Sequence, residues 1–588
     1  MRFFRPGLGA FLLTSMLTSV WAPSQAFAQQ WAHFTPPPMK NEAPVEAANG
    51  MAVSAQHYAS EVGAQILKDG GNAIDAAVAI GYALAVVYPS AGNIGGGGLA
   101  TIHLASGKDT FINFREKAPA AASANMYLDA KGNVIPMASL YGYKAVAVPG
   151  TVMGLEKMLA EYGTMKRAQV MAPAIKLAEQ GFVLQAGDLA FFQANSDYFH
   201  KEPNVGAIFL KNGKPYAPGD RLVQKDLAQT LKQIAAKGPD VFYKGDIASR
   251  VVAASKARGG LLTMKDFADF TAEETPTVTC DYRGYRIISA PPPSSGGPII
   301  CEIANILSAY PMDKMPHHSA KSIHFMVEAM RHAYVDRNFG LGDPAFVKNP
   351  LDKILSAKHA ADIRAKIDPV KATPSSEVKP GTPPHQDAQT THFSVVDKDG
   401  NAVSITYTIN GIASGFGAQV IAGNTGFFLN NEMDDFTSKV GAPNLYGLVQ
   451  GAANSIQPGK RPLSSMSPTI VTKDGKLFMV TGSPGGSFII TTVLESILNV
   501  VDHKMNVKAA VDMPRLHHQW LPDVITAEPG AIKPEVKKEL EAAGYKVSEE
   551  DNVLFGFDEA ILVGTRNGKR VVYGANDRRA TSGSAAGY

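Results

Sequence analysis

Long apolar runs are almost absent from this chain of 588 residues. One of the two covers residues 72–87, which are dominated by Ala, Val, Ile and Leu but contain Asp75, and it predicts a buried helix. The other covers residues 8–21, which is too short to cross a bilayer comfortably. It follows Arg2 and Arg5 and precedes Ala26-Phe27-Ala28, a small-x-small sequence of the kind that signal peptidase reads. We therefore expect a signal peptide at residues 1–28, cleavage after Ala28 and export to the periplasm, with a short membrane anchor as the alternative.

An excess of either charge is also lacking, because 56 Lys and Arg face 53 Asp and Glu. The net charge of +3 falls to +1 once Arg2 and Arg5 leave with the signal peptide. A near-neutral chain offers no electrostatic footprint for nucleic acid or for an anionic membrane surface. With 19% charged and 45% hydrophobic residues, the composition is that of a globular chain. We expect no nucleic-acid partner and no membrane partner.

Cysteine is scarce, with only Cys280 and Cys301 in the chain. They suggest neither a cysteine metal site nor a thiol nucleophile. Both lie in the exported part, where a disulfide can form. Because Cys280 falls in a strand-like run and Cys301 in a helical pattern, we expect two unpaired, buried thiols, with a disulfide as the alternative.

Metal ligands of other kinds are not convincingly grouped. His324, Glu328 and His332 recur at four-residue spacing, which would place them on one face of a helix. No further ligand is indicated, so a polar stripe on an amphipathic helix is the better interpretation. His517 and His518 are adjacent and lack that spacing. We expect no metal and no other cofactor.

What the chain does contain is an abrupt change at residue 390. Residues 371–389 are rich in Pro and Ser and nearly free of apolar side chains, which predicts an exposed linker. Residues 390–396 and 402–409 then alternate as strands do around an Asp-Gly turn, which predicts a β-hairpin. Thr390 is thus expected to begin a central strand directly after a linker.

A threonine in that position can become a nucleophile if the chain is cut before it. The hydroxyl needs a base, and a free α-amino group with a pKa of about 7.7–8.0 supplies one when Thr390 is the first residue. Alone, this signal is weak, because Thr is a common strand residue.

Three further segments could complete such a site. Residues 477–501 read as a strand, a glycine turn and an apolar helix, so the amides of the turn at residues 482–487 could stabilise an oxyanion. Residues 461–468 place paired hydroxyls beside an apolar strand, and residues 430–436 form a polar cluster. Each segment can equally be an ordinary turn.

Taken together, these segments form an ordered series of motifs. From Gln389 the chain reads QTTHFSVVDKDGNAVSITYTIN, followed by LNNEMDDF, PNLYGLV, RPLSSMSPTI, TGSPGGS and PRLHHQWLPD. Upstream come NIGGGG, NFREKAPA, PGTVMG, GPDVFYKG, DYRGY and PPPSSGG. The series resembles bacterial γ-glutamyltranspeptidase, also called glutathione hydrolase, over nearly the whole mature chain. The resemblance implies an α+β fold, the four-layer αββα sandwich of the N-terminal nucleophile hydrolases, which our strand and helix patterns alone do not select.

The resemblance also implies self-cleavage between Gln389 and Thr390. The products would be a large subunit of residues 29–389 and a small catalytic subunit of residues 390–588, which stay together as a heterodimer. Thr390 would then attack the γ-glutamyl amide of glutathione and related compounds. The acyl-enzyme would pass its γ-glutamyl group to water or to an amino-acid or dipeptide acceptor.

Roles for individual residues follow from the same resemblance. In catalysis, Thr408 would support the nucleophile, and Gly485 and Gly486 would supply the oxyanion-hole amides. The substrate-binding residues would hold its α-carboxylate (Arg115, Ser464 and Ser465), hold its α-ammonium (Asp435, Asn410 and Glu432) or close a lid over it (Tyr446). For Arg115 the simpler alternative is a surface ion pair, and for Tyr446 a solvent-facing loop position.

Two features depart from the family pattern. Residues 411–417 form a slightly longer stretch after Asn410, and Glu432 stands where many bacterial members have Gln. These departures bear on acceptor preference and on ammonium recognition, not on the nucleophile.

Two other functions compete with this interpretation. A cephalosporin-type acylase would take a glutaryl-like group without an ammonium, and Asp435 argues against it because an acid that faces no cation is costly. A non-catalytic exported binding protein would keep the pocket but would need neither Thr390 nor the linker.

Overall fold

A computed structural model describes residues 37–378, 390–411, 415–551 and 553–588. The expected signal peptide and Gln389 lie outside these residues. The centre of the molecule is built from two seven-stranded sheets whose neighbouring strands are antiparallel. The first sheet has the order β1 (Val45–Ala47), β18 (Lys569–Asn576), β17 (Glu559–Arg566), β13 (Lys476–Thr481), β12 (Thr469–Lys473), β9 (Tyr285–Ser289), β8 (Val278–Tyr282). The second has the order β19 (Ser584–Gly587), β2 (Met51–Ser54), β10 (Thr391–Val396), β11 (Ala402–Thr408), β3 (Gly97–His103), β4 (Asp109–Asn113), β7 (Glu273–Thr275).

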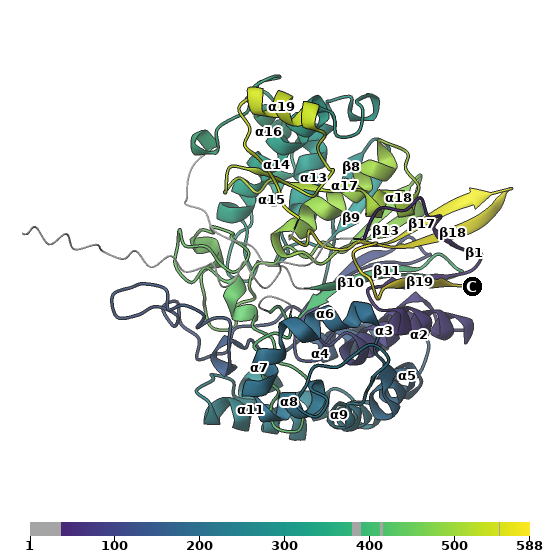
Figure 1. Cartoon of the computed structure of the whole chain (residues 1–588), viewed down its shortest axis with the longest axis vertical. Coiled ribbons are helices and arrows are strands. Elements are labelled where there is room, and N and C mark those ends of the chain that lie inside the picture. The colour runs from purple at the N-terminus through teal and green to yellow at the C-terminus, as the bar shows by residue number, and fades with distance from the viewer. Residues whose placement is uncertain (1–36, 379–389, 412–414, 552) are drawn as a thin grey trace, which may run out of the picture.

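Helices cover the outer face of each sheet (Figure 1). Against the second sheet lie α2 (His57–Lys68), α3 (Ala73–Val87), α4 (Thr151–Tyr162), with α5 (Arg167–Gln180) and α9 (Lys225–Lys237) outside them. Against the first sheet lie α13 (Gly296–Leu307) and α18 (Val507–Asp512). Helix α17 (Ile489–Val501) packs on both of them, and α14 (Ala320–Gly340) packs on α13. The expected four-layer αββα sandwich is confirmed.

The remaining elements are peripheral. The helices are α6 (Ala186–Ala194), α7 (Ser196–Lys201), α8 (Pro203–Phe209), α10 (Asp240–Tyr243), α11 (Asp246–Ala257), α12 (Met264–Ala268), α15 (Leu351–Ile354), α16 (Ala357–Arg364) and α19 (Pro534–Ala542). Two small sheets contain β14 (Leu516–His517), β15 (Ile525–Ala527) and β16 (Val547–Glu549), and β5 (Phe182–Val183) and β6 (Arg221–Leu222).

The period-two pattern of the strands explains the stacking. On β10, Phe393 and Val395 pack into the apolar core beneath α3, whereas Val396 packs into a separate core between the two sheets. Ser394 also faces the other sheet, where its hydroxyl donates to the Glu559 carbonyl at 2.7 Å. Successive residues therefore serve opposite layers, and buried hydroxyls tie one sheet to the other.

Helix α3 forms where the local sequence pattern predicts a buried helix. Every residue of α3 is buried, as its almost unbroken Ala, Val, Ile and Leu content predicts. Asn72 caps the N-terminus by accepting from the amides of Ile74 and Asp75, while the Asp75 carboxylate accepts from the Asn72 amide. The sequence alone placed this helix correctly.

The segments on either side of residue 390 interleave in both sheets. Strands β10 and β11 pair with each other and lie between β2 and β3, which come from the N-terminal part of the chain. In the first sheet, β1, β8 and β9 flank four strands from the C-terminal part. No boundary between separate domains runs through residue 390 in the described part of the chain.

The expectation of two unpaired thiols is wrong. Cys280 on β8 and Cys301 on α13 form a disulfide with a Cα–Cα distance of 5.6 Å. Helix α13 packs directly on the edge strand β8, so one cysteine in a strand and one in a helix face each other across a layer boundary. The local patterns gave the two elements but not their contact.

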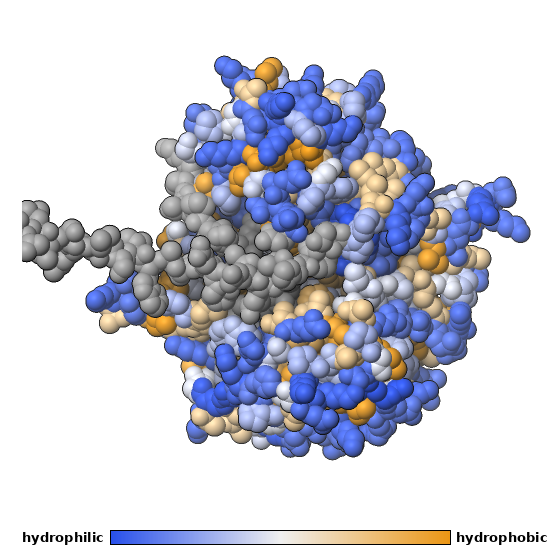
Figure 2. Space-filling model, viewed as in Figure 1, coloured by the Kyte–Doolittle hydropathy of each residue, from blue (hydrophilic) through white to orange (hydrophobic). Residues whose placement is uncertain are grey.

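The outer surface is polar. On the face in Figure 2, hydrophilic residues predominate over both helical layers, and apolar residues form only small patches. Among the described residues, no helix is both long enough and apolar enough to span a membrane.

Candidate active site

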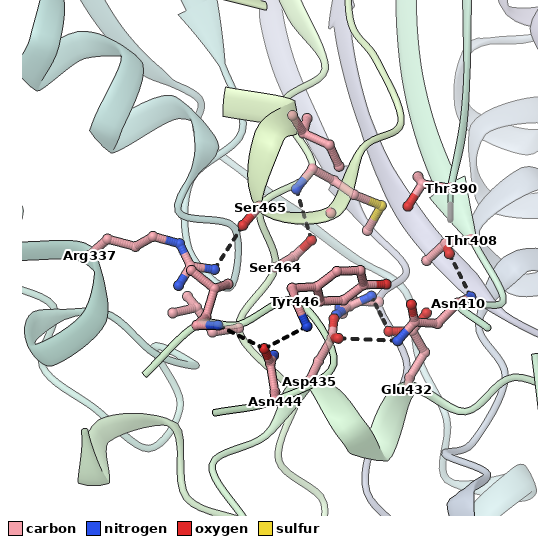
Figure 3. A pocket seen from close by; sticks show the side chains of 16 residues that line it. Arg337, Thr390, Thr408, Asn410, Glu432, Asp435, Asn444, Tyr446, Ser464 and Ser465 are labelled. Atoms are coloured by element: carbon pink, nitrogen blue, oxygen red, sulfur yellow. Dashed lines mark hydrogen bonds and ion pairs between the residues drawn. The ribbon is translucent and has the colours of Figure 1, made fainter. Parts of the chain in front are cut away.

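Thr390 lies at the entry to β10, and only 5% of its surface is exposed. It lines a cavity whose walls come from segments on both sides of residue 390. The cavity is lined by Arg115, Arg337, Thr390, Thr408, Asn410, Glu432, Asp435, Asn444, Tyr446, Leu448, Leu463, Ser464, Ser465, Met466, Gly486 and Ile489. Residues far apart in the sequence, including all but two of the predicted site residues, therefore meet at one cavity (Figure 3). The two others are Gly485, which is adjacent to Gly486, and Gln389, which lies outside the described residues.

Thr408 ends β11 beside the strand that Thr390 opens. The backbone amide of Asn410 donates to the Thr408 hydroxyl at 2.6 Å, and the Asn410 side-chain amide donates to Asp435 at 3.2 Å. Asn410 adopts φ +57°, a left-handed conformation that Asn tolerates better than most residues. The turn after β11 thus links the Thr408 hydroxyl to the acidic side of the cavity.

The glycine run at residues 93–98 permits this packing. A Cβ on Gly96 would lie 2.0 Å from the Thr408 carbonyl oxygen. Only glycine lets the backbone approach the end of β11 so closely. The glycine run therefore serves close packing of one backbone segment on another.

Arg115 forms the electrostatic centre of the cavity. It follows β4, is 1% exposed, and its guanidinium contacts Glu432 at 2.7 Å, Asp435, and Glu116 at 3.6 Å. Its Nε also donates to the Pro462 carbonyl at 3.3 Å. The alternative of a surface ion pair is excluded, since both Arg115 and Glu116 are buried.

Two of the buried carboxyls around this guanidinium, Glu432 and Glu116, have raised pKa values. Burial raises the pKa of Glu432, and the charges of Glu116 and Asp435 add to the effect, while Arg115 opposes it. Burial likewise raises the pKa of Glu116. Oε1 of Glu432 and Oδ1 of Asn410 are buried and accept no hydrogen bond from the described residues. This side of the cavity therefore has acceptor capacity for a cation.

Ser464 and Ser465 lie on the opposite side, on the segment that leads into β12. The Ser464 backbone pairs with the loop before α13, where its amide donates to the Pro293 carbonyl at 2.8 Å and its carbonyl accepts from the Ser295 amide at 2.8 Å. The Ser465 hydroxyl accepts from Arg337 at 2.8 Å (Figure 3). The cavity therefore has a hydroxyl side and an acidic side.

The glycine turn between β13 and α17 closes a third side. Gly485 and Gly486 adopt φ +140° and +55°, conformations that side chains disfavour. A Cβ on Gly486 would come within 2.3 Å of the Tyr446 ring, so the ring rests directly on this turn. The predicted strand, turn and helix are all present at β13 and α17.

Tyr446 is not a solvent-facing loop residue, since it is only 7% exposed. Asn444 holds the loop around it by accepting from the amides of Tyr446 at 3.0 Å and Leu448 at 3.2 Å. Asp434 accepts from the Leu445 amide at 2.9 Å, and burial raises the pKa of this carboxyl to about 6. The loop is thus fixed over the cavity.

Several lining residues were missed from the sequence. Five of them are Asn444, Leu448, Leu463, Met466 and Ile489, which are neighbours of predicted site residues. The sixth, Arg337, lies in the last turn of α14, more than fifty positions before Thr390. An arginine near a helix C-terminus is common for reasons of the helix dipole, so no local signal marked it.

The described residues that could bind a metal ion do not line this cavity. Glu302, Asp336 and His359 are the one group among the described residues that could hold an ion. His359 Nε2 lies 2.7 Å from Asp336 and 3.2 Å from Glu302, so ion pairs within the group account for its geometry. His324 bonds to Tyr545 and to the Asp368 carbonyl, as a structural histidine does.

A threonine at the start of a central strand, in a four-layer αββα sandwich and at the wall of a charged cavity, defines an N-terminal nucleophile hydrolase. Residues 59–588 match the sequence profile of the gamma-glutamyltranspeptidase family. The chain belongs to this family.

Individual relatives agree. A glutathione hydrolase proenzyme of Pseudomonas sp. (strain A14) is 58% identical over 555 residues, covering 93% of this chain and 96% of that protein. The glutathione hydrolase proenzyme of Escherichia coli (strain K12) is 49% identical over 549 residues, covering 93% of each. Among solved structures, a cephalosporin acylase from Bacillus halodurans matches with a TM-score of 0.80 at 28% identity, over 94% of this chain and 98% of that one. The Helicobacter pylori gamma-glutamyltranspeptidase matches with 0.55 at 45% identity, over 58% and 97%.

Proposed function

We propose that the chain is a self-processing γ-glutamyltransferase and glutathione hydrolase with Thr390 as its nucleophile. The observation that carries this is the position of Thr390 at the wall of a cavity with buried cationic and anionic side chains. A γ-glutamyl group carries both an α-carboxylate and an α-ammonium, so it matches a cavity of this kind.

Processing and catalysis use the same hydroxyl. The Thr390 hydroxyl attacks the Gln389 carbonyl, its oxygen replaces the Thr390 nitrogen, and water hydrolyses the resulting ester to free the Thr390 amine. That amine then accepts the hydroxyl proton as Thr390 attacks the γ-amide carbonyl, and the departing amine takes the proton with it. Thr408, whose hydroxyl is fixed by the Asn410 amide, holds Thr390 in place.

The charged groups orient the substrate. Arg115 binds the α-carboxylate through its planar guanidinium, with the hydroxyls of Ser464 and Ser465 as further donors. Asp435 and Glu432 pair with the α-ammonium, and the Asn410 Oδ1 atom is a further acceptor. Support for this division comes from the buried acceptor atoms of Glu432 and Asn410, which have no other described partner.

The turn after β13 stabilises the negative charge that develops on the carbonyl oxygen of the substrate. The amides of Gly485 and Gly486, at the start of α17, stabilise the oxyanion of the tetrahedral intermediate. Tyr446, packed on this turn, forms part of a lid over the acyl-enzyme.

The mature protein follows from two cuts. Residues 1–28 direct export to the periplasm and are then removed. Cleavage before Thr390 gives the large subunit of residues 29–389 and the small subunit of residues 390–588. Water or an amino-acid or dipeptide amine releases the γ-glutamyl group.

A cephalosporin-type acylase is the second candidate. The Bacillus halodurans acylase shares the fold at a TM-score of 0.80, and an Acylase ACY 1 proenzyme of Pseudomonas sp. (strain SE83) is 38% identical over 88% of this chain. Against it stand Asp435 and Glu432, two buried acids that face the cavity. A glutaryl group would bring no cation to these acids, which would then share Arg115 alone.

Comparison of the wild type with Thr390→Ala tests the proposal. We expect two wild-type bands on a denaturing gel and hydrolysis of a γ-glutamyl-anilide, whereas the variant stays one band and is inactive. The non-catalytic alternative requires one uncut wild-type band without activity. A higher kcat/KM for the glutaryl-anilide than for the γ-glutamyl-anilide would instead identify an acylase.

A further inference from the structure

Arg337 is a second buried arginine at the cavity, and its surroundings differ from those of Arg115. It is 1% exposed and lies in the last turn of α14. Among the described residues, no carboxylate oxygen lies within 4.0 Å of its guanidinium, whereas Arg115 contacts three acids. Arg337 is thus a buried cation without a contacting anion.

Its hydrogen bonds go to neutral oxygens only. The guanidinium donates to the hydroxyls of Ser295 at 3.0 Å and Ser465 at 2.8 Å, and to the side-chain carbonyl of Asn338 at 3.0 Å. Burial lowers the pKa of Arg337 to about 10, which still leaves it charged at neutral pH. Placing a cation here costs free energy that these neutral partners offset only in part.

The bond to Ser465 determines what the serine can do. A hydroxyl has one proton to donate, and because its oxygen already accepts from Arg337, that proton is directed elsewhere. Ser464 is arranged in the same way, since its hydroxyl oxygen accepts from the Met466 amide at 3.0 Å. Neither hydroxyl donates to an acceptor among the described residues. Both are therefore available as donors to an acceptor in the cavity.

Arg337 also fixes the backbone that carries the two serines. Its partner Ser295 donates its own hydroxyl to the Ser464 carbonyl at 2.7 Å. The Arg337 guanidinium thereby holds Ser465 directly (Figure 3) and Ser464 through Ser295.

We propose that Arg337 is a positioning residue that fixes the Ser465 hydroxyl as a donor to the α-carboxylate of the γ-glutamyl group, and adds uncompensated positive charge behind it. This inference rests on the proposed function. The two arginines then have different roles. Arg115 binds the α-carboxylate while it also pairs with the acids, and Arg337 acts on the α-carboxylate through Ser465.

Two substrates that differ only in the α-carboxylate test it. We would measure kcat/KM for the γ-glutamyl-anilide and for the 4-aminobutyryl-anilide, at high enzyme concentration, in the wild type, Arg337→Met, Arg337→Lys and Ser465→Ala. Because hydrogen bonds to charged groups are worth more than neutral ones, Arg337→Met should lose about 10- to 100-fold on the γ-glutamyl substrate. On the 4-aminobutyryl substrate it should be nearly unchanged, and Arg337→Lys should be intermediate.

A double variant separates positioning from general packing. If Arg337 acts through Ser465, adding Ser465→Ala to Arg337→Met should reduce selectivity for the carboxylate by much less than Ser465→Ala does alone. Equal losses on both substrates, or independent effects of the two substitutions, would overturn the inference.

Folding is followed on the same samples by self-cleavage and by thermal melting. If Arg337→Met does not fold, Arg337→Lys decides the matter, because it keeps the charge and should still show a selective loss on the γ-glutamyl substrate. A wild type inactive on the γ-glutamyl-anilide would refute the proposed function, whereas an active wild type with unchanged selectivity in the Arg337 variants would refute only this inference.

Discussion

At the scale of single residues, the cavity is organised by an imbalance of charge. Arg115 contacts Glu432, Asp435 and Glu116, so three acids share one contacting guanidinium. Such a group cannot stay fully ionised in a buried site without a further cation. A substrate ammonium is the cation that the proposed reaction supplies, and its binding should favour loss of a proton from the acids.

The pH dependence of substrate binding should reveal this coupling. The pKa of Glu432 is raised by burial and by neighbouring acids, so its anionic form is lost as the pH falls through the raised value. Since the ammonium needs the anion, KM for the γ-glutamyl-anilide should rise as the pH falls through this raised pKa, by up to about tenfold per pH unit for one titrating group. Steady-state kinetics at fixed ionic strength measure it.

Glu432→Gln is the matched control, because many bacterial members of the family have glutamine there. With Asp435 as the remaining anion, the variant should bind the substrate more weakly than the wild type near pH 8 and show a flatter KM profile on the acid side. Identical profiles for the two proteins would contradict a role for the Glu432 charge.

The place of a residue in the site could be predicted where a recognisable motif surrounds that residue, and not elsewhere. Thr390, Arg115 and Asp435 stand in recognisable segments, and the structure places all three at one cavity. Arg337 stands in an ordinary helical pattern, and its link to Ser465 spans 128 positions of sequence. Nothing local to residue 337 encodes that contact.

At the scale of elements, turns and caps decide the geometry of the site. The turn at Gly485 and Gly486 joins β13 to α17 with two positive φ values and supports the Tyr446 ring. The elements themselves followed from their patterns, as α3 and the β10–β11 hairpin show. The contact of β10 with β2, and that of β8 with α13, did not, because pairing over such distances depends on the completed sheets.

Gly486→Ala should damage this turn. The new Cβ would lie 2.3 Å from the Tyr446 ring at a backbone angle of φ +55°, so both the ring and the turn must shift. We expect kcat/KM for the γ-glutamyl-anilide to fall at least about tenfold, because the displaced turn carries the proposed oxyanion-hole amides.

Gly475→Ala provides the comparison. Gly475 lies in the β12–β13 turn with φ +71°, and no atom lies within 4 Å of the position that its new Cβ would take, so this substitution introduces the strain without the clash. It should leave kcat/KM unchanged. Equal effects of the two substitutions would mean that strain in general, not the contact with Tyr446, limits activity.

The disulfide links the edge strand β8 to the covering helix α13. It closes a sequence separation of 21 residues, for which loop entropy predicts a stabilisation on the order of 3 kcal/mol. The Cys280→Ala, Cys301→Ala double variant should therefore melt several degrees lower than the wild type. Thiol titration of the denatured, unreduced wild type should find no free thiol, and detection of two would show that the bond is not formed.

At the scale of the whole molecule, the two expected subunits are interleaved. Strands β10 and β11 of the small subunit lie between β2 and β3 of the large one, and β1 and β9 border small-subunit strands in the other sheet. Three apolar cores draw residues from both subunits. Separation would expose these cores and break two sheets, so the cleaved chains should behave as one body.

Size-exclusion chromatography with light scattering tests this expectation. The processed wild type should elute at the volume of the uncut Thr390→Ala precursor, both in dilute buffer and in concentrated NaCl, because apolar packing and not surface charge joins the subunits. The two chains should part only in denaturant. Elution of a separate small subunit in high salt would show that charge holds them together.

Because the strands interleave, the chain must fold before it can be cut. The surroundings of Thr390 exist only when β2, β3, β10 and β11 have assembled, and these strands come from both sides of the bond that is cut. A misfolded chain therefore lacks the means to cut itself. If the chain is cut before Thr390 as we propose, each active molecule must already have reached the native fold.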